Sequence, residues 1–177
     1  MNAKIDEFLS ELNEPSVEQF LYVKTVAEEI MPHRVLEIGS GYGICSSASL
    51  VTTNAILVSV DPIVSLPQLE RRTKSVDVWD RIIRHIGKSI DVLPKLEEKF
   101  DLIIVDGDHG YDTVYFDIET SLKLLNPNGV LLIDDFSHIH NWDSSYGVAR
   151  ATTELAQKYK FSFSVASVAH GIARINT

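Results

Sequence analysis

The sequence has little cysteine, no long apolar run and no excess of positive charge. Among its 177 residues Cys45 is the single cysteine, so no internal disulfide can form, which favours a reducing, cytoplasmic location. No apolar run approaches the roughly 18 residues of a membrane span, and the acidic N-terminus lacks the apolar core of a signal peptide. The net charge of −9 disfavours nucleic acid as a partner. A small-molecule substrate is therefore the stronger expectation.

The remaining composition is that of one globular domain, with 45% hydrophobic and 23% charged residues. Short β-branched runs alternate with longer amphipathic stretches, which is typical of βαβ units and a mostly parallel sheet. We expect a single α/β, Rossmann-like domain over residues 1–177, with a helical segment (1–32) before the first strand. Its seven-stranded sheet has helices on both faces and ends in an antiparallel hairpin at the sheet edge.

Strands are expected at residues 34–38, 55–60, 81–86, 101–106 and 130–135, and the tail supplies two more. The almost purely aliphatic run 101–106 predicts a central strand covered on both faces. Helices are expected from Ser16, as N-cap, to Pro32, from about Ile44, and over 90–99, 111–125 and 144–158. The run 126–129, Asn-Pro-Asn-Gly, predicts the end of the fourth of these helices.

A glycine-rich turn follows the first expected strand. Glu37 precedes a G-x-G-x-G sequence that contains Gly39, Ser40, Gly41 and Gly43. Glycine allows positive φ and a close approach of the backbone to a ligand. A dinucleotide site has the spacing G-x-G-x-x-G, and a carboxylate beside the turn would repel its pyrophosphate. The same carboxylate suits the ammonium and sulfonium groups of S-adenosyl-L-methionine, so we expect this cofactor rather than NAD.

Asp61 lies at the end of the second expected strand. A carboxylate there can accept hydrogen bonds from both hydroxyls of a ribose, which is a strong charge-assisted interaction. NAD enzymes use the same contact, so Asp61 predicts a nucleoside without identifying it. The alternative is an aspartate that caps the loop before Pro62.

Three aspartates follow two neighbouring strands: Asp106 after the fourth, and Asp134 and Asp135 after the fifth. Parallel strands lie about 4.8 Å apart, so their carboxyl ends bring these side chains together. A hard divalent cation such as Mg²⁺, Ca²⁺ or Mn²⁺ relieves their repulsion, whereas the sequence has no Cys/His spacing for zinc. The alternative is that Asp134 and Asp135 cap the following loop and Asp106 binds a backbone amide.

The runs VLEIGSGYG, SVDP and GKSIDVLPKL resemble motifs of the class I S-adenosylmethionine-dependent methyltransferases, in particular the catechol O-methyltransferase type. This resemblance implies that Gly87, Lys88 and Ser89 lie along the adenine ring. The alternative for these residues is a plain strand-to-helix turn with Ser89 as N-cap, and the two roles are compatible.

Residues 100–136 are similar to metal-dependent O-methyltransferases over their whole length, and the Asp134-Asp135 pair resembles the macrocin and mycinamicin sugar enzymes. The resemblance implies that Asp106, Asp134 and Asp135 bind Mg²⁺ and that Asp106 lies beside the cofactor. It also implies that His109 is the catalytic base, because the mycinamicin type has a histidine at this offset. A histidine suits proton removal from a metal-acidified hydroxyl. The alternative is a loop histidine hydrogen-bonded to Asp106 or Asp108.

The sequence therefore predicts divalent-metal-assisted O-methylation of a small-molecule hydroxyl, sugar or catechol-like. An NAD-linked oxidoreductase and a non-catalytic cofactor-binding protein of the same fold are the alternatives. His138 and His140 are expected to face solvent or substrate rather than a metal, and Cys45 to be a small buried residue. At this chain length the acceptor pocket is open or is completed by a neighbouring subunit, so a homo-oligomer stays an open prediction.

Overall fold

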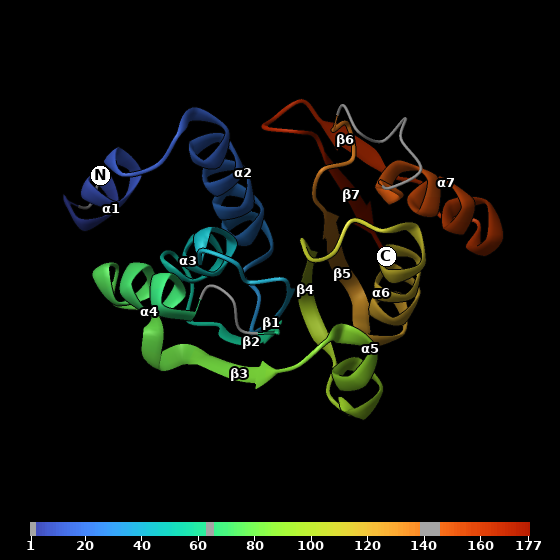
Figure 1. Cartoon of the computed structure of the whole chain (residues 1–177), viewed down its shortest axis with the longest axis horizontal. Helices are drawn as coiled ribbons and strands as arrows, with labels where there is room; N and C mark the ends of the chain where they lie inside the picture. Colours follow the sequence, from blue (N-terminus) through green and yellow to red (C-terminus); the bar gives the residue numbers. More distant parts are fainter. Residues whose placement is uncertain (1–2, 63–65, 139–145) are drawn as a thin grey trace.

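The computed structural model describes residues 3–62, 66–138 and 146–177. Its seven strands form one sheet in the order β3-β2-β1-β4-β5-β7-β6 (Figure 1). The parallel strands are β1 (Arg34–Ile38), β2 (Ile56–Asp61), β3 (Ile82–Ile86), β4 (Phe100–Val105) and β5 (Leu125–Ile133). The antiparallel hairpin is β6 (Ser164–Ala166) with β7 (Ile172–Asn176), and β7 also pairs with β5. The expected α/β fold is confirmed.

Helices cover both faces of the sheet (Figure 1). One face carries α1 (Ala3–Ser10), α2 (Glu14–Ile30), α3 (Ile44–Leu50) and α4 (Leu66–Ser75); the other carries α5 (Ser89–Val92), α6 (Tyr111–Leu124) and α7 (Val148–Tyr159). Two 3₁₀ turns complete the set: η1 (Trp79–Arg81) precedes β3, and η2 (Leu93–Lys95) follows α5. Alternate residues of β4 enter opposite cores: Leu102 packs with α2 and α3, and Ile103 packs with α6 and α7. This confirms that the aliphatic strand is central and covered on both faces.

Several element boundaries differ from the expected ones. Asn13, not Ser16, caps α2: its side-chain oxygen accepts a hydrogen bond from the Ser16 amide at 3.0 Å, and Pro15 fits the first turn, where no N–H partner is needed. The helix expected over 90–99 is only the short α5 followed by η2, because Pro94 lacks the N–H that would bond to the carbonyl of Ile90. Likewise Lys88, not Ser89, occupies the N-cap position of α5.

The run 126–129 ends α6 as predicted but belongs to β5, where the pairing register shifts between Phe100 and Leu102. Asn128 has a positive φ of 64°, as expected of the residue type that best tolerates it after glycine. The last expected helix begins at Val148 in the structure, and its expected start at Ser144, like His140, lies outside the described residues. Within the described ranges, no helix combines the length and apolar character needed to cross a membrane.

Candidate active site

The carboxyl ends of the parallel strands share one edge of the sheet, and the glycine turn packs against its neighbours there. The Gly39 amide donates to the carbonyl of Val60 at 2.9 Å, and the Asp106 amide donates to the carbonyl of Ile38 at 2.8 Å. Gly39 has a φ of +85°, and a Cβ at this position would overlap the carbonyl of Asp106. Only glycine therefore lets the turn lie flat against the chain that follows β4.

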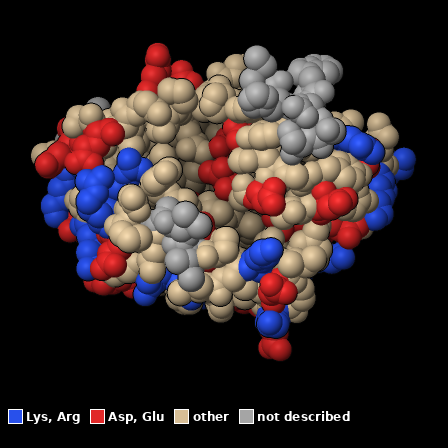
Figure 2. Space-filling view, in the orientation of Figure 1, with Lys and Arg blue, Asp and Glu red and all other residues tan. Residues whose placement is uncertain are grey.

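Two cavities meet at Gly39. The first has a volume of about 340 Å³, and Lys88, Ser89, Gly107 and Asp117 are among the residues that line it. The second has a volume of about 330 Å³ and is lined in part by Glu37, Ser40, Gly41, Asp106, Asp134 and Asp135. Figure 2 shows acidic side chains on the wall of the hollow in the middle of this face. The structure thus brings most of the sequence-predicted residues around two cavities that share Gly39.

Asp61, Gly87 and Gly43 lie at the edges of these spaces. The Asp61 carboxylate accepts a hydrogen bond from the Gly41 amide at 3.1 Å, and the Gly87 amide donates to the Asp61 carbonyl at 3.2 Å. Asp61 also lines a small recess beside Gly41 and Ile86. Gly43, with a φ of 79°, precedes the first residue of α3. Asp61 therefore joins the glycine turn to the loop after β3.

Glu37 is a buried carboxylate in the middle of the sheet edge. Ser46 donates a hydrogen bond to it, yet burial raises the pKa of Glu37 to about 7. Asp117, on α6, is also buried, and burial raises its pKa to about 6. The nearby Ser89 hydroxyl partly offsets that burial, but neither Asp117 oxygen makes a hydrogen bond of normal geometry among the described residues. Each cavity therefore contains a carboxylate that lacks compensating positive charge.

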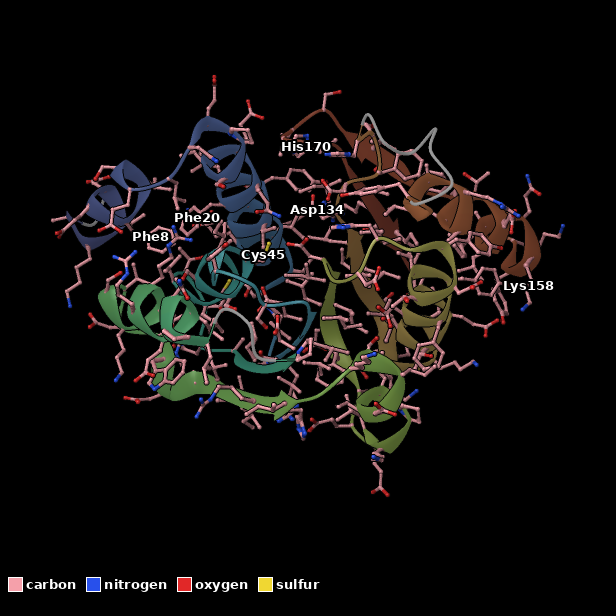
Figure 3. The ribbon with its side chains drawn as sticks, viewed as in Figure 1. Phe8, Phe20, Cys45, Asp134, Lys158 and His170 are labelled. Atoms are coloured by element: carbon pink, nitrogen blue, oxygen red, sulfur yellow. The ribbon has the colours of Figure 1, made fainter. Side chains whose placement is uncertain are left out.

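Asp106 and Asp134 share a partner that the sequence did not indicate. Gln19 of α2 donates from its amide nitrogen to both carboxylates, at 3.1 Å to Asp106 and also to Asp134. Burial, together with repulsion from neighbouring aspartates, raises the pKa of Asp106 well above its usual range and that of Asp134 to about 6. The second oxygen of Asp134 is buried and has no hydrogen-bond partner among the described residues. Figure 3 shows Asp134 near the centre of the molecule, on the same side as His170.

Asp135 has a different environment. His109 Nε2 lies 2.8 Å from Asp135 Oδ2, and the Tyr146 hydroxyl donates to the same oxygen at 3.2 Å. Burial opposes ionisation of Asp135, but the contacts with His109 and Tyr146 and the nearby His138 together outweigh it and lower the pKa of Asp135. The His109 ring stacks on Tyr146 with 4.6 Å between ring centroids. The alternative expectation paired His109 with Asp106 or Asp108. In the structure its carboxylate neighbour is Asp135 instead.

The three predicted metal ligands are close in space, but the tightest ligand group is another one. Among the described residues, Asp135, His138 and His170 form the group whose ligand atoms all lie within 4.8 Å of one another. Ligation by Asp106, Asp134 and Asp135 therefore stays a prediction. Cys45 is buried as expected, with its sulfur 4.0 Å from Asp106, and burial raises the pKa of its thiol.

The pKa values of Glu37 and Asp117 predict an unusual dependence of stability on pH. Both carboxyls have a higher pKa in the folded protein than in the unfolded chain. Between the unfolded and the folded pKa of each group, the folded state therefore holds more protons. The free energy of unfolding should therefore rise as the pH falls from about 7.5 to 5.5, by about 1.4 kcal/mol per pH unit for each extra bound proton. Urea unfolding of the ligand-free protein at several pH values measures this.

The variant Glu37→Gln isolates one contribution to this effect. It keeps an oxygen that can accept the Ser46 hydrogen bond but cannot titrate, so the slope of unfolding free energy against pH should become shallower. A wild-type stability that increases steadily with pH across this window would contradict the assignment of raised pKa values.

The comparisons with known proteins agree with this geometry. Residues 36–136, more than half of the chain, match the family described as "Methyltransferase domain". The protein therefore belongs to the methyltransferase domain family. The matched segment contains the glycine turn, Asp61, His109 and all three aspartates.

Relatives include O-methyltransferase hkm8 of Aspergillus hancockii, which is 30% identical over 129 residues, 71% of this chain and 51% of that protein. The chain spans about half the length of the curated relatives it matches. Among solved structures, the O-methyltransferase TomG of Streptomyces achromogenes in complex with SAM has a TM-score of 0.81 at 19% identity, covering 100% of this chain and 90% of TomG. SAH-bound methyltransferase PaMTH1 of Podospora anserina has a TM-score of 0.77 at 22% identity, with coverages of 99% and 88%. These structures share the fold.

Proposed function

We propose that the protein is an S-adenosyl-L-methionine-dependent methyltransferase that acts on a hydroxyl oxygen of a small molecule. The observation that carries the proposal is the pair of cavities that Gly39 lines, one beside Lys88, Ser89 and Asp117 and the other beside Glu37 and the aspartates. A cofactor with a nucleoside at one end and a positively charged amino acid at the other matches this division. The relative from Aspergillus hancockii is an O-methyltransferase, which supports the same reaction class.

The first cavity suits the adenosine end of the cofactor. The unsatisfied Asp117 oxygens can accept from the exocyclic amino group of adenine. Asp61, which lines the small recess beside Gly41, can accept from the ribose hydroxyls. In the second cavity, Glu37 offers negative charge to the ammonium and sulfonium groups, which favours its ionised form. Gly41 leaves the backbone bare beside the second cavity, because a Cβ at this position would meet open space.

The aspartates fit a hard divalent cation, with Mg²⁺ as the first candidate. Among the described residues the buried Asp134 oxygen has no hydrogen-bond partner, and contacts from the Gln19 amide, His109 and the Tyr146 hydroxyl offset part of the repulsion among the carboxylates. Asp106, Asp134 and Asp135 would hold the ion, and oxygen ligands are those that Mg²⁺ prefers. A bound cation there would acidify the acceptor hydroxyl.

When bound, S-adenosyl-L-methionine supplies an electrophilic methyl carbon and leaves as a neutral thioether. His109 accepts the hydroxyl proton at Nδ1, because its Nε2 is buried against Asp135. Asp135 then stabilises the imidazolium, and Tyr146 holds the ring by stacking. The two cavities align the reacting atoms, an effect that contributes roughly 7–11 kcal/mol in well-oriented reactions.

Calorimetric titration tests the cofactor assignment. The wild-type protein should bind S-adenosyl-L-methionine and S-adenosylhomocysteine, and NAD should give no heat of binding. Asp61→Asn should weaken cofactor binding by roughly 10- to 100-fold, since one charge-assisted hydrogen bond is lost. The control Asp80→Asn removes an exposed carboxylate of η1, so binding should be unchanged. Absence of S-adenosyl-L-methionine binding by the wild type would reject the proposal.

A sugar or catechol-like acceptor, a cytoplasmic location and a homo-oligomeric state are further parts of this proposal. The acceptor class is supported by the Asp134-Asp135 pair and by the open second cavity. Methyl transfer assays across diols and phenols with added Mg²⁺ would separate the two acceptor types.

A further inference from the structure

We propose that Asp135, His138 and His170 form a binding site for a borderline transition-metal ion such as Zn²⁺, Co²⁺ or Ni²⁺. One ligand atom from each of the three side chains lies within 4.8 Å of the other two. This site differs from the predicted set of three aspartates, with which it shares only Asp135. Metal binding here does not depend on the proposed methyltransferase activity, so the two proposals can fail separately.

The backbone holds these three residues together without a ligand. The His138 amide donates to the Asp135 carbonyl at 3.1 Å, which closes a tight turn after β5. The turn between β6 and β7 is attached to the same segment, because Ser137 N donates to the His170 carbonyl at 2.7 Å and Phe136 N donates to the Gly171 carbonyl at 2.8 Å. Two segments that are distant in sequence are thereby joined beside Asp135.

A glycine makes this close approach possible. Gly171 has a φ of +83°, and a Cβ at this position would overlap the side chain of Ser137. The segment after β5 can therefore approach the β6–β7 turn closely enough to bring His138 and His170 together. Metal sites need this pre-positioning, because ligands on freely moving loops lose entropy when the ion binds.

The ring geometry is compatible with shared coordination. The rings of His138 and His170 have centroids 4.7 Å apart and meet at 69°, so they are not stacked face to face. Tyr146 stacks on His138, with 4.8 Å between ring centroids, and supports its orientation. Figure 3 shows His170 on the same side of the molecule as Asp134. Asp135 and His170 both line the second cavity, so the ion would lie at the wall of that cavity.

The ligand chemistry selects the class of ion. Two imidazoles with one carboxylate suit Zn²⁺, Co²⁺, Ni²⁺ and Fe²⁺, whereas Mg²⁺ and Ca²⁺ prefer oxygen ligands alone. The sequence favoured solvent or substrate roles for His138 because no ligand spacing was visible. Its partner His170 is more than thirty positions away, and only the pairing of β7 with β5 places it nearby.

A Co²⁺ titration of the untagged, chelator-treated protein tests this site through the visible absorption of the bound ion. We expect one equivalent to bind, and Zn²⁺ to displace it. His170→Ala and His138→Phe should each weaken Co²⁺ binding by about tenfold or more, and the phenylalanine retains a ring to stack on Tyr146. The matched control His33→Ala removes an exposed histidine at the start of β1 and should leave the titration unchanged.

The variant Asp134→Asn separates the two metal proposals, because Asp134 belongs only to the aspartate set. Co²⁺ binding that persists in Asp134→Asn and weakens in both histidine variants supports the site. Wild-type protein that binds no Co²⁺, or binding that is unchanged in His170→Ala and His138→Phe, would overturn it. Loss of binding in Asp134→Asn with no loss in the histidine variants would also overturn it and would assign the ion to the aspartates.

Discussion

Asp134→Asn is expected to lower kcat for methyl transfer by about 10²- to 10³-fold, equivalent to roughly 3–4 kcal/mol of transition-state stabilisation. The substitution keeps an oxygen for the Gln19 amide but removes the charge that would hold the divalent cation. Affinity for S-adenosyl-L-methionine should change little, because Asp134 does not line the nucleoside cavity. Steady-state rates at saturating Mg²⁺, together with calorimetry for the cofactor, measure both quantities.

Two comparisons make this result specific to the cation. Treatment of the wild type with a chelator should produce the same loss of rate, and added Mg²⁺ should restore the wild type but not Asp134→Asn. Asp80→Asn, which alters an exposed carboxylate far from the aspartates in sequence, should retain wild-type kcat. A wild-type rate in Asp134→Asn would show that methyl transfer does not use a cation at this position.

The sequence predicted the fold well because its patterns are local. Aliphatic strands, helical periodicity and turn residues each extend over a few positions, and parallel strands must end at one sheet edge. These local patterns, together with the shared edge of parallel strands, were enough to predict that Glu37, Asp106 and the Asp134-Asp135 pair surround one cavity. Errors were confined to boundaries such as the cap of α2 and the short α5, where a single asparagine or proline decides the outcome.

The partners of these residues could not be predicted in the same way. Gln19 reaches the aspartates from α2, and Tyr146 reaches Asp135 from the chain before α7, so neither contact has a short-range signal. Asp117 is an exception, because a carboxylate between Val114, Ile118 and Ser121 on the buried side of α6 is a signal that the sequence does contain. A charged residue in a buried helical stripe requires either a partner or a ligand.

His109→Phe is expected to reduce kcat by about 10²- to 10⁴-fold, the range usual for loss of a general base. Phenylalanine can still stack on Tyr146, so the loss would reflect proton transfer rather than a collapsed loop. The loss should appear in kcat, with the affinity for the cofactor unchanged. Steady-state rates, with calorimetry for the cofactor as a check on folding, provide the test.

The His109→Phe result also depends on which ion is present, because Asp135 contacts His109 and belongs to both candidate metal sites. Co²⁺ absorption resolves this: a base that is not a ligand can be removed with the spectrum preserved, whereas His170→Ala should alter the spectrum. His33→Phe, at an exposed position outside the site, should keep the wild-type rate. If His109→Phe retains the wild-type kcat, another group accepts the proton, and the contact with Asp135 then serves only to hold the loop after β4.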